Sequence, residues 1–415
     1  MKRALPLLAL IAVGCGGNNT GAPTPGLYSD TARNSKEREE MVANASKSIT
    51  KGDAAKVVSQ SNEFGARLIS EIGTDKNVLI SPISIATALT IAMNGASGTT
   101  LDEMKKALGL EKISMEQVNA AHASLRTLLG DEQLRIANSI WTRKGVAFEE
   151  PFMKDNTAFF NAKIGDLDFA APESSGVIND WVKSATDGKI EEIVPKTISN
   201  DVVMYIINAV SFNAKWKDPF DVKLTQQLPF TLPDSKTVDA DFMTMDSHIT
   251  NGTSKEGDQW IRLPYANGRF ELIAAMPKAG RSLKQTISKM DILATAAPNP
   301  GKVLLNFPKF KLSYESAMVE ILKKLGIKEA FTDKANFSRL RAKKDVMITD
   351  VKHKTFIDVS EEGTKAAAAT SVEVGVTAMP VTTKISFNRP FAYAIREIKS
   401  GQIIFLGVLA DPTAN

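Results

Sequence analysis

The side chains that most often carry catalysis are scarce in this chain. It has three histidines, His122, His248 and His353, and a single cysteine, Cys15. Neither a Gly-x-Ser-x-Gly elbow nor a His-Glu-x-x-His pair occurs, so the nucleophile turn of a serine hydrolase and the paired ligands of a zinc peptidase are both missing. We therefore expect a protein that is not an enzyme and that uses no metal or other cofactor.

The position of Cys15 indicates a modification rather than a catalytic role. Two basic residues and the short apolar run Ala4–Val13 precede Gly14 and the cysteine. This is the order of a secretory leader, and the run is too short to span a membrane as a mature helix. It resembles the cleavage site of bacterial lipoproteins, where the thiol is lipidated and becomes the new N-terminus. A plain secretory leader is the alternative.

The chain accordingly divides into three predicted parts. Residues 1–14 form a lipoprotein signal peptide, residues 15–55 carry the lipid anchor, a flexible tether and a polar lead-in, and residues 56–415 form one folded domain. We expect a secreted protein that is anchored to the bacterial outer membrane, on its periplasmic or cell-surface face. The 51 basic and 47 acidic residues are nearly balanced, which gives no support for a nucleic-acid partner.

The most unusual segment is Glu361–Thr377, which follows a predicted strand at Thr355–Val359. Along a strand its side chains would alternate between two faces. From Thr364 onward, one face carries only small, apolar or Thr side chains, and both charges fall on the other. No proline interrupts the segment, so it could enter a sheet as a central strand. A small-residue loop, or a weak helix favoured by its four alanines, is the alternative.

The surrounding pattern predicts the elements that must hold this segment. Apolar residues at helical spacing predict helices at residues 57–72, 83–93, 178–185 and 317–325, and the second of these is apolar nearly all round and therefore buried. Thr100 and Glu103 have the spacing of a capping box for a further helix that Gly109 closes. Strands are predicted at residues 202–212, 270–276 and 303–312, with a closing hairpin at 391–398 and 403–409. Ordered structure should begin near Lys56. Because helices dominate the first half of the chain and strands the second, the pattern favours an α+β domain.

Motifs spread over the region Lys56–Pro412 together resemble the serpin family. In chain order they are Asn77–Ile85, Gly95–Met104, Asn179–Val182, Gly188–Ile190, Asn208–Phe212, Trp216, Pro219-Phe220, Phe307–Phe310, Leu325-Gly326, Ala330-Phe331, Asn336–Ser338, His353–Phe356, Glu361–Ala369, Asn388–Phe391 and Phe405–Gly407. The resemblance implies an α+β serpin fold, with about nine helices around three mostly antiparallel β-sheets and an exposed reactive-centre loop. It also implies a suicide inhibitor of serine proteases. The target attacks the loop and forms an acyl-enzyme, and the cleaved loop then enters the main sheet as a new strand.

The resemblance assigns roles to individual residues. The hinge of the loop comprises Glu361, Gly363, Thr364, Lys365, Ala366, Ala367, Ala368 and Ala369. The shutter beneath the sheet comprises Ser81, Ser84, Asn208 and His353. The breach, where insertion begins, comprises Trp216 and Lys309, and Lys309 could pair with Glu361.

Family spacing places the reactive bond at Thr377–Ala378. The loop is about two residues longer than usual when it is counted back from Pro390, so Val376–Thr377 and Ala378–Met379 stay open as alternatives. No basic residue lies between Lys365 and Lys384, which disfavours a trypsin-like target. An elastase-like or subtilisin-like protease is expected, and some cysteine proteases also stay open.

The implied partners are a target protease, held covalently, and a membrane reached through the lipid on Cys15. We expect a monomer. The alternative function is that of a non-inhibitory serpin acting as a binding module. Such members often have a disrupted hinge, whereas Thr364 and the four alanines after Lys365 are small throughout.

Overall fold

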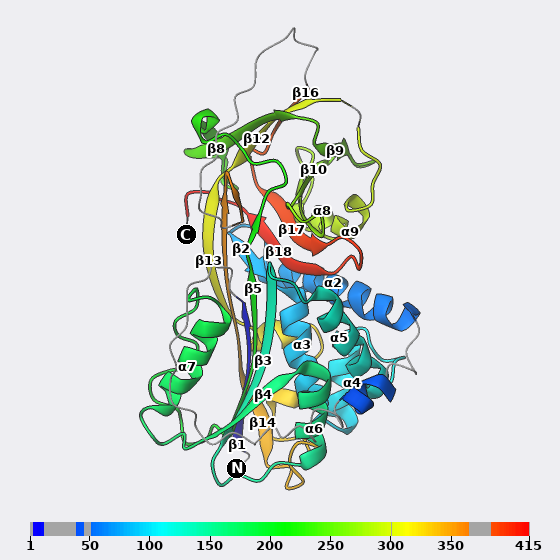
Figure 1. Cartoon of the computed structure of the whole chain (residues 1–415), viewed down its shortest axis with the longest axis vertical. Coiled ribbons are helices and arrows are strands. Elements are labelled where there is room, and N and C mark those ends of the chain that lie inside the picture. The colour runs from blue at the N-terminus through cyan, green and yellow to red at the C-terminus, as the bar shows by residue number, and fades with distance from the viewer. Residues whose placement is uncertain (1–2, 12–38, 45–50, 300, 365–382, 415) are drawn as a thin grey trace. The chain divides into compact units, whose positions relative to one another are not determined.

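The computed structural model describes residues 3–11, 39–44, 51–299, 301–364 and 383–414 (Figure 1). A short helix lies at residues 39–44. The other α-helices are α2 (Lys51–Ile72), α3 (Pro82–Met93), α4 (Gly98–Ala107), α5 (Met115–Leu129), α6 (Glu150–Phe160), α7 (Ser174–Ala185), α8 (Leu283–Ile287), α9 (Met290–Leu293) and α10 (Val319–Lys324). Among the described residues, no helix has both the length and the apolar character that crossing a membrane requires.

The strands are β1 (Arg3–Ile11), β2 (Val78–Ile80), β3 (Leu134–Arg143), β4 (Ala162–Leu167), β5 (Met204–Phe212), β6 (Ala214–Lys215), β7 (Gln226–Thr231), β8 (Thr237–Ser247), β9 (Thr250–Thr253), β10 (Gln259–Pro264), β11 (Phe270–Met276), β12 (Val303–Pro308), β13 (Phe310–Ala317), β14 (Val346–Ser360), β15 (Gly363–Thr364), β16 (Thr383–Ser386), β17 (Phe391–Glu397) and β18 (Ile403–Leu409).

The chain forms two compact units, each built from three separate segments. The first comprises residues 1–64, 82–212 and 315–355, and the second comprises residues 65–81, 213–314 and 356–415. Several elements, among them α2 and β14, contribute residues to both units. That residues 56–415 form one domain stays a prediction.

The first unit contains a sheet in the order β4-β3-β5-β1-β14, with α3 and α7 on opposite sides of it (Figure 1). Every residue of β5 and of α3 is buried. Because both faces of such a strand are buried, apolar residues are favoured at successive positions and polar and apolar residues do not alternate. This explains the continuous apolar run that predicted β5.

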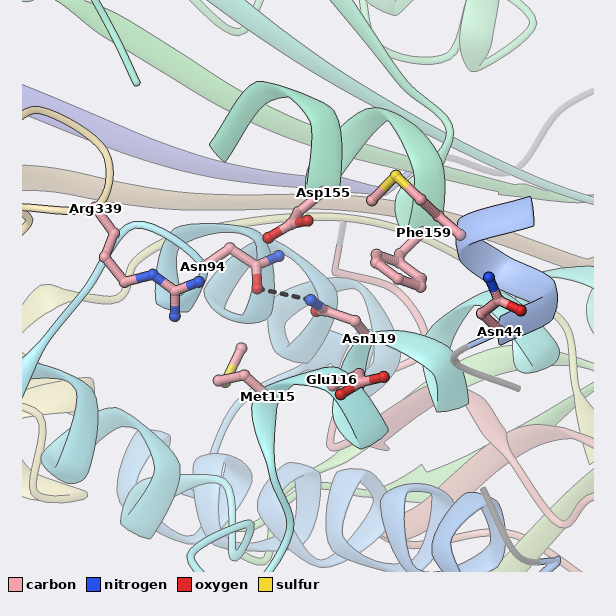
Figure 2. A pocket seen from close by; sticks show the side chains of 9 residues that line it. Asn44, Asn94, Met115, Glu116, Asn119, Asp155, Phe159 and Arg339 are labelled. Atoms are coloured by element: carbon pink, nitrogen blue, oxygen red, sulfur yellow. Dashed lines mark hydrogen bonds between the residues drawn. The ribbon is translucent and has the colours of Figure 1, made fainter. Parts of the chain in front are cut away.

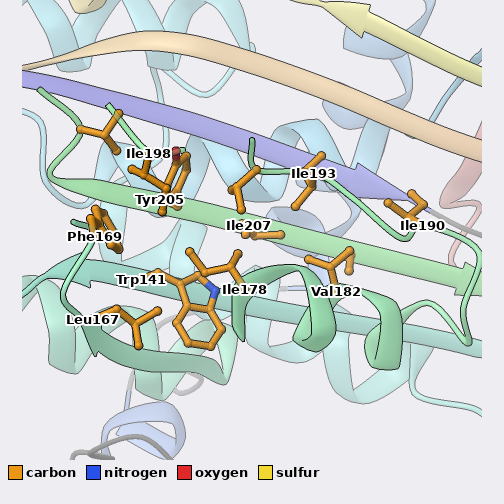
Figure 3. Close-up of a cluster of buried hydrophobic side chains, with 13 residues drawn as sticks. Trp141, Leu167, Phe169, Ile178, Val182, Ile190, Ile193, Ile198, Tyr205 and Ile207 are labelled. Atoms are coloured by element: carbon orange, nitrogen blue, oxygen red, sulfur yellow. The ribbon is translucent and has the colours of Figure 1, made fainter. Parts of the chain in front are cut away.

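Helix α7 buries one apolar stripe against the sheet, as its sequence spacing predicted. Figure 3 shows Ile178 and Val182 packed with Trp141, Tyr205 and Ile207 in one cluster. The remaining stripe residues of the helix, Trp181 and Ala185, are partly buried against the same cluster.

The second unit contains two further sheets. A six-stranded sheet has the order β2-β18-β17-β11-β10-β9, and a four-stranded sheet has the order β16-β12-β8-β7. The strands β17 and β18 pair antiparallel around the turn at Lys399–Gly401, so the predicted closing hairpin is confirmed. Most strand pairs are antiparallel, while β1, β4 and β16 pair parallel to their neighbours.

Three sequence expectations were wrong in detail. The predicted strand at residues 303–312 is two strands, because Pro308 cannot donate to a ladder and the pairing changes from β8 to β14 beyond it. Ordered helix begins at Lys51 in α2, before Lys56. Thr100 lies inside α4 and is not its cap: its hydroxyl donates to Glu329, 2.7 Å away, and Ser97 occupies the N-cap position.

Glu103, the other half of the expected capping box, also makes contacts distant in sequence. One of its carboxylate oxygens accepts hydrogen bonds from the backbone N–H groups of Lys328 and Glu329, both at 2.7 Å. The spacing that is typical of a helix start here joins α4 to a loop instead. Gly109, with φ +68°, follows the helix in the left-handed conformation, as expected for its end.

Candidate functional site

The central feature of the first unit is a strand position between β5 and β14. The strand β1 fills it and pairs parallel with both neighbours, Leu7–Ile11 with Ile206–Val210 and Arg3–Leu10 with Val346–Lys354. The register along β14 shifts at Pro6, where proline supplies no ladder donor. The sheet is thus wide enough at this point to hold one strand between β5 and β14.

Two shutter residues face each other across this position. Ala9 of β1 pairs with Asn208 on one side and with His353 on the other. The two residues therefore lie at one level of the sheet, about two strand spacings or 9.5 Å apart in backbone terms. The strand β1 therefore separates the Asn208 and His353 backbones at this level of the sheet.

All four predicted shutter residues are completely buried. The Asn208 amide donates to Asn138 Oδ1 at 2.6 Å, and the Asn138 amide donates to the Phe160 carbonyl at 2.7 Å. Ser84 lies in α3, which packs against β5, whereas Ser81 precedes this helix and belongs to the second unit. Asn138 was missed in the sequence, since nothing in the spacing of β3 marks its contact with β5.

In the second unit the hinge begins as a two-residue strand. Gly363 and Thr364 of β15 pair antiparallel with β14 on one side and with β6 on the other. Gly363 has φ +152°, and an added Cβ would overlap the Ala214 backbone carbonyl, so only glycine fits here. Thr364 is completely buried, and its hydroxyl hydrogen-bonds the Tyr265 hydroxyl at 2.6 Å.

An aromatic stack holds the turn before this strand. The Trp216 ring lies on the Tyr265 ring with centroids 4.6 Å apart and planes inclined by 14°. The Trp216 indole N–H donates to the Ser360 carbonyl at 2.9 Å, and its backbone N–H donates to the Glu362 carbonyl at 2.9 Å. Burial raises the pKa of Tyr265, which keeps its phenol neutral. Tyr265 was missed in the sequence because it is remote along the chain from both partners.

Glu361 forms the ion pair that the sequence suggested. Its carboxylate lies 3.0 Å from the Lys309 ammonium and accepts a 2.8 Å hydrogen bond from Thr225. Burial alone would raise the pKa of Glu361, but hydrogen bonds from its backbone, Lys309 and Thr225 outweigh burial, and the pKa is lowered. The carboxylate is therefore held in its charged form at the start of the hinge. Thr225 was not recognised in the sequence.

The remaining predicted site residues lie outside the described residues. They are Cys15, Lys365, Ala366, Ala367, Ala368, Ala369, Thr377 and Ala378. The expected exposure of the reactive-centre loop falls there too. Within the part of the chain that the structure describes, no three His, Cys, Asp or Glu side chains gather as metal ligands would.

Comparison with known proteins identifies the family. The family model described as "Serpin (serine protease inhibitor)" matches residues 59–412. Human Serpin B9 is 32% identical over 373 residues, covering 85% of this chain and 98% of its own length. The Drosophila melanogaster serine protease inhibitor 42Dd is 32% identical over 365 residues, covering 86% and 97%.

Solved structures agree with the sequence matches. The native state of the thermophilic serpin tengpin has a TM-score of 0.78 at 32% identity, with 88% of this chain and 95% of that chain covered. Human thyroxine-binding globulin, solved as a ligand complex, has a TM-score of 0.76 at 25% identity, with 87% and 100% covered. The predicted α+β fold with several β-sheets is thereby confirmed, and this chain belongs to the serpin family.

Proposed function

We propose that this chain inhibits serine proteases by inserting its cleaved reactive loop between β5 and β14. The observation that carries the proposal is the strand position itself, where a segment of the chain already pairs with both neighbours. Serpins form covalent complexes with target proteases, and an inserted loop would keep the acyl-enzyme away from hydrolysis. The chain then acts as a substrate that traps its protease and not as an enzyme.

The register of the hinge supports insertion of the loop antiparallel to β14. In β15, Thr364 faces Val359 and Gly363 faces Ser360, so each step forward along the loop moves one residue back along β14. If this antiparallel register continued without a bulge, residues 365–377 would face residues 358–346, and Thr377 would reach Val346 at the start of β14. Cleavage at Thr377–Ala378 would therefore free a segment that matches the available strand.

Insertion in this register would be strongly favourable. Roughly a dozen ladder hydrogen bonds would form, at about 1 kcal/mol net each. The small side chains at 366–369 would enter without steric cost, and the valines beyond them would add apolar burial. Since about 1.4 kcal/mol changes an equilibrium constant tenfold, the trapped state would be reached in one direction only.

The loop sequence favours an elastase-like or subtilisin-like target. The residues before the candidate bonds, Val376, Thr377 and Ala378, are small or β-branched. We further propose that the mature protein begins at a lipidated Cys15, stays monomeric, and faces the periplasm or the cell surface from the outer membrane. Radiolabelled palmitate should enter the wild-type protein and not the Cys15→Ala variant.

Mixing the protein with pancreatic elastase or subtilisin tests the inhibitory function. A stable higher-mass adduct should survive a denaturing gel, and mass spectrometry should place the cut at Thr377–Ala378. Trypsin is the matched control and should give far less adduct. Cleavage by both enzymes without any adduct would instead favour the binding-module function, which the likeness to thyroxine-binding globulin supports.

A further inference from the structure

The two faces of the sheet in the first unit are covered differently. On the α3 side, a cavity of about 350 Å³ lies between the end of α3 and the helices α5 and α6 (Figure 2). On the α7 side, the apolar cluster of Figure 3 includes Ile190, Ile193, Val194 and Ile198 as well as α7 itself. These four residues belong to the segment that joins α7 to β5, residues 186–203, which we call the cover segment. The cover segment therefore packs on the same face of the sheet as α7.

One amide side chain joins the cover segment to α7. Asn179 of this helix donates through Nδ2 to the Val194 carbonyl at 3.0 Å. Its Oδ1 accepts from the backbone N–H groups of Ile193 and Val194, at 2.9 and 3.0 Å. Because a backbone N–H can only donate, the oxygen and nitrogen of this amide are assigned without ambiguity. The helix and the cover segment should therefore move together.

Loop insertion would reach this cover at one end first. Tyr205, Ile207 and Ala209 belong to the cluster, so alternate side chains of β5 point to the α7 face, and Ser211 is the next of them. A strand that enters beside β5 would add side chains to this face, where the cover segment already lies. The hinge pairs with β6, which follows β5 in the chain after one residue, so insertion begins at the Ser211 end of β5.

At that end an ion pair fixes the cover segment to the sheet. The Asp187 carboxylate lies 2.7 Å from the Arg135 guanidinium of β3, and it accepts a 3.3 Å hydrogen bond from the Ser211 hydroxyl of β5. Arg135 and Ser211 pair with each other in the ladder, one residue along β5 from Val210, which pairs with Ile11 at the end of β1. The carboxylate thus joins two strands directly beyond the end of the filled strand position.

The backbone at Asp187 depends on these contacts. Its φ is +51°, in the left-handed region that few residues other than glycine adopt and that Asn and Asp tolerate best. Gly188 follows with φ +78°. Conformations of this kind persist where the surrounding contacts hold them. Loss of the contacts to Arg135 and Ser211 would allow this turn to relax and the cover segment to open.

We propose that Asp187 is a latch that keeps the cover segment on the sheet and thereby sets the rate at which the cleaved loop inserts. This role rests on the proposed inhibitory function and adds a positioning residue to it. The carboxylate must separate from both strands before α7 and the cover segment can lift, so its loss should speed insertion and leave the inserted state unchanged. Because the Arg135 side chain is 58% exposed, salt should weaken the latch by screening.

The Asp187→Asn variant, introduced into the full chain, tests the proposal. Asn keeps the size of the side chain and tolerates the left-handed backbone, and it removes the charge. At saturating elastase the rate of adduct formation should rise about two- to fivefold, the range expected for the loss of a partly exposed ion pair. Fewer loops should be cut without trapping. The wild-type rate should rise between about 0.02 M and about 0.5 M NaCl, and the rate of the variant should change little. Arg135→Gln should act in the same direction.

The matched control is Glu191→Gln. Glu191 pairs with Lys183 of α7 at 3.2 Å and is 75% exposed, so this ion pair joins the cover segment to the helix and not to the sheet. Its loss should change neither the trapping rate nor the salt dependence, and thermal unfolding of the uncleaved variants checks that each is folded. The latch is overturned if Asp187→Asn traps elastase at the wild-type rate, or if Glu191→Gln speeds trapping equally. If the wild type itself gives no adduct, the inhibitory function fails, and the role of Asp187 fails with it.

Discussion

At the turn between β14 and β15, the Glu361 carboxylate joins two other segments of the second unit through Lys309 and Thr225. Glu361 itself is 5% exposed, whereas the Lys309 side chain is 42% exposed. The pair is therefore partly screened by water, and its hydrogen bonds count for more than its Coulomb attraction. The Thr225 hydroxyl needs an acceptor at this position, which a glutamine could still supply through Oε1 but without the negative charge.

Replacing Glu361 with Gln should destabilise the protein in a pH-dependent way. Because the folded pKa is lowered, the charged carboxylate adds stability above the pKa of the unfolded chain, about 4.3, and that stability is lost as the pH falls through the folded pKa. We expect a loss of roughly 1–3 kcal/mol in the free energy of unfolding at pH 7. Urea titrations at pH 7, 5 and 4 measure it.

The control for this variant is Glu315→Gln. Glu315 pairs with Lys354 at 3.3 Å but is 56% exposed, so its loss should cost about 0.5 kcal/mol or less. An equal loss for Glu361→Gln at pH 4 and at pH 7 would show that the charge is not what stabilises this turn.

Substituting Thr364 with Arg should convert the inhibitor into a substrate. Thr364 is completely buried against Tyr265, and a strand that extends from it would have to carry a buried guanidinium into the sheet. Elastase should then cut the loop without leaving an adduct on denaturing gels. Thr364→Val keeps the shape of the side chain and should still trap the protease. Adduct formation by Thr364→Arg at the wild-type level would contradict loop insertion.

At the scale of residues, the sequence identified only one of the two partners in several contacts around the hinge. Motif matching identified Trp216, Lys309 and Glu361, and it suggested the pairing of the last two. It did not identify Tyr265 or Thr225, although these supply the stack and the third hydrogen bond. Both are ordinary residues at strand ends or in loops, and only the folded chain brings them to the hinge.

At the scale of elements, apolar periodicity correctly predicted which face of a helix is buried. The spacing of polar residues did not correctly predict their hydrogen-bond partners. The stripe of α7 was predicted because one apolar face recurs every turn. The capping box of α4 was wrong because Thr100 and Glu103 have the right spacing but bond residues more than 200 positions away in sequence. A short-range pattern cannot distinguish a local partner from a distant one.

Truncating Ile178 on α7 tests the packing of this helix on the sheet. The side chain is fully buried in the cluster that Figure 3 shows, so Ile178→Ala should lower the free energy of unfolding by about 2–5 kcal/mol. Ser184→Ala, an exposed position on the same helix, should change it by about 0.5 kcal/mol at most. Guanidinium titrations measure both. A negligible effect of Ile178→Ala would mean that α7 does not stabilise the sheet through this cluster.

At the scale of the whole molecule, the sequence predicted the fold class and most elements but not the occupant of the central strand position. The apolar run at Ala4–Val13 was interpreted as a leader, and the structure pairs Arg3–Ile11 between β5 and β14. A short apolar run is typical of a leader and of a buried strand alike. Pairing across a sheet depends on residues 200 to 350 positions away, which no local pattern reports.

One strand position cannot hold β1 and the reactive loop together, so the two should compete. A chain that begins at Cys15 lacks β1 and should accept the loop. A synthetic peptide of residues 3–11, added to that chain, should raise its Tm by roughly 5–10 °C, because several ladder hydrogen bonds form at about 1 kcal/mol each. The peptide should also suppress the elastase adduct. The same peptide with alternate backbone amides methylated cannot complete a ladder and should do neither. If the unmodified peptide changes neither Tm nor adduct yield, β1 and the loop do not share this position.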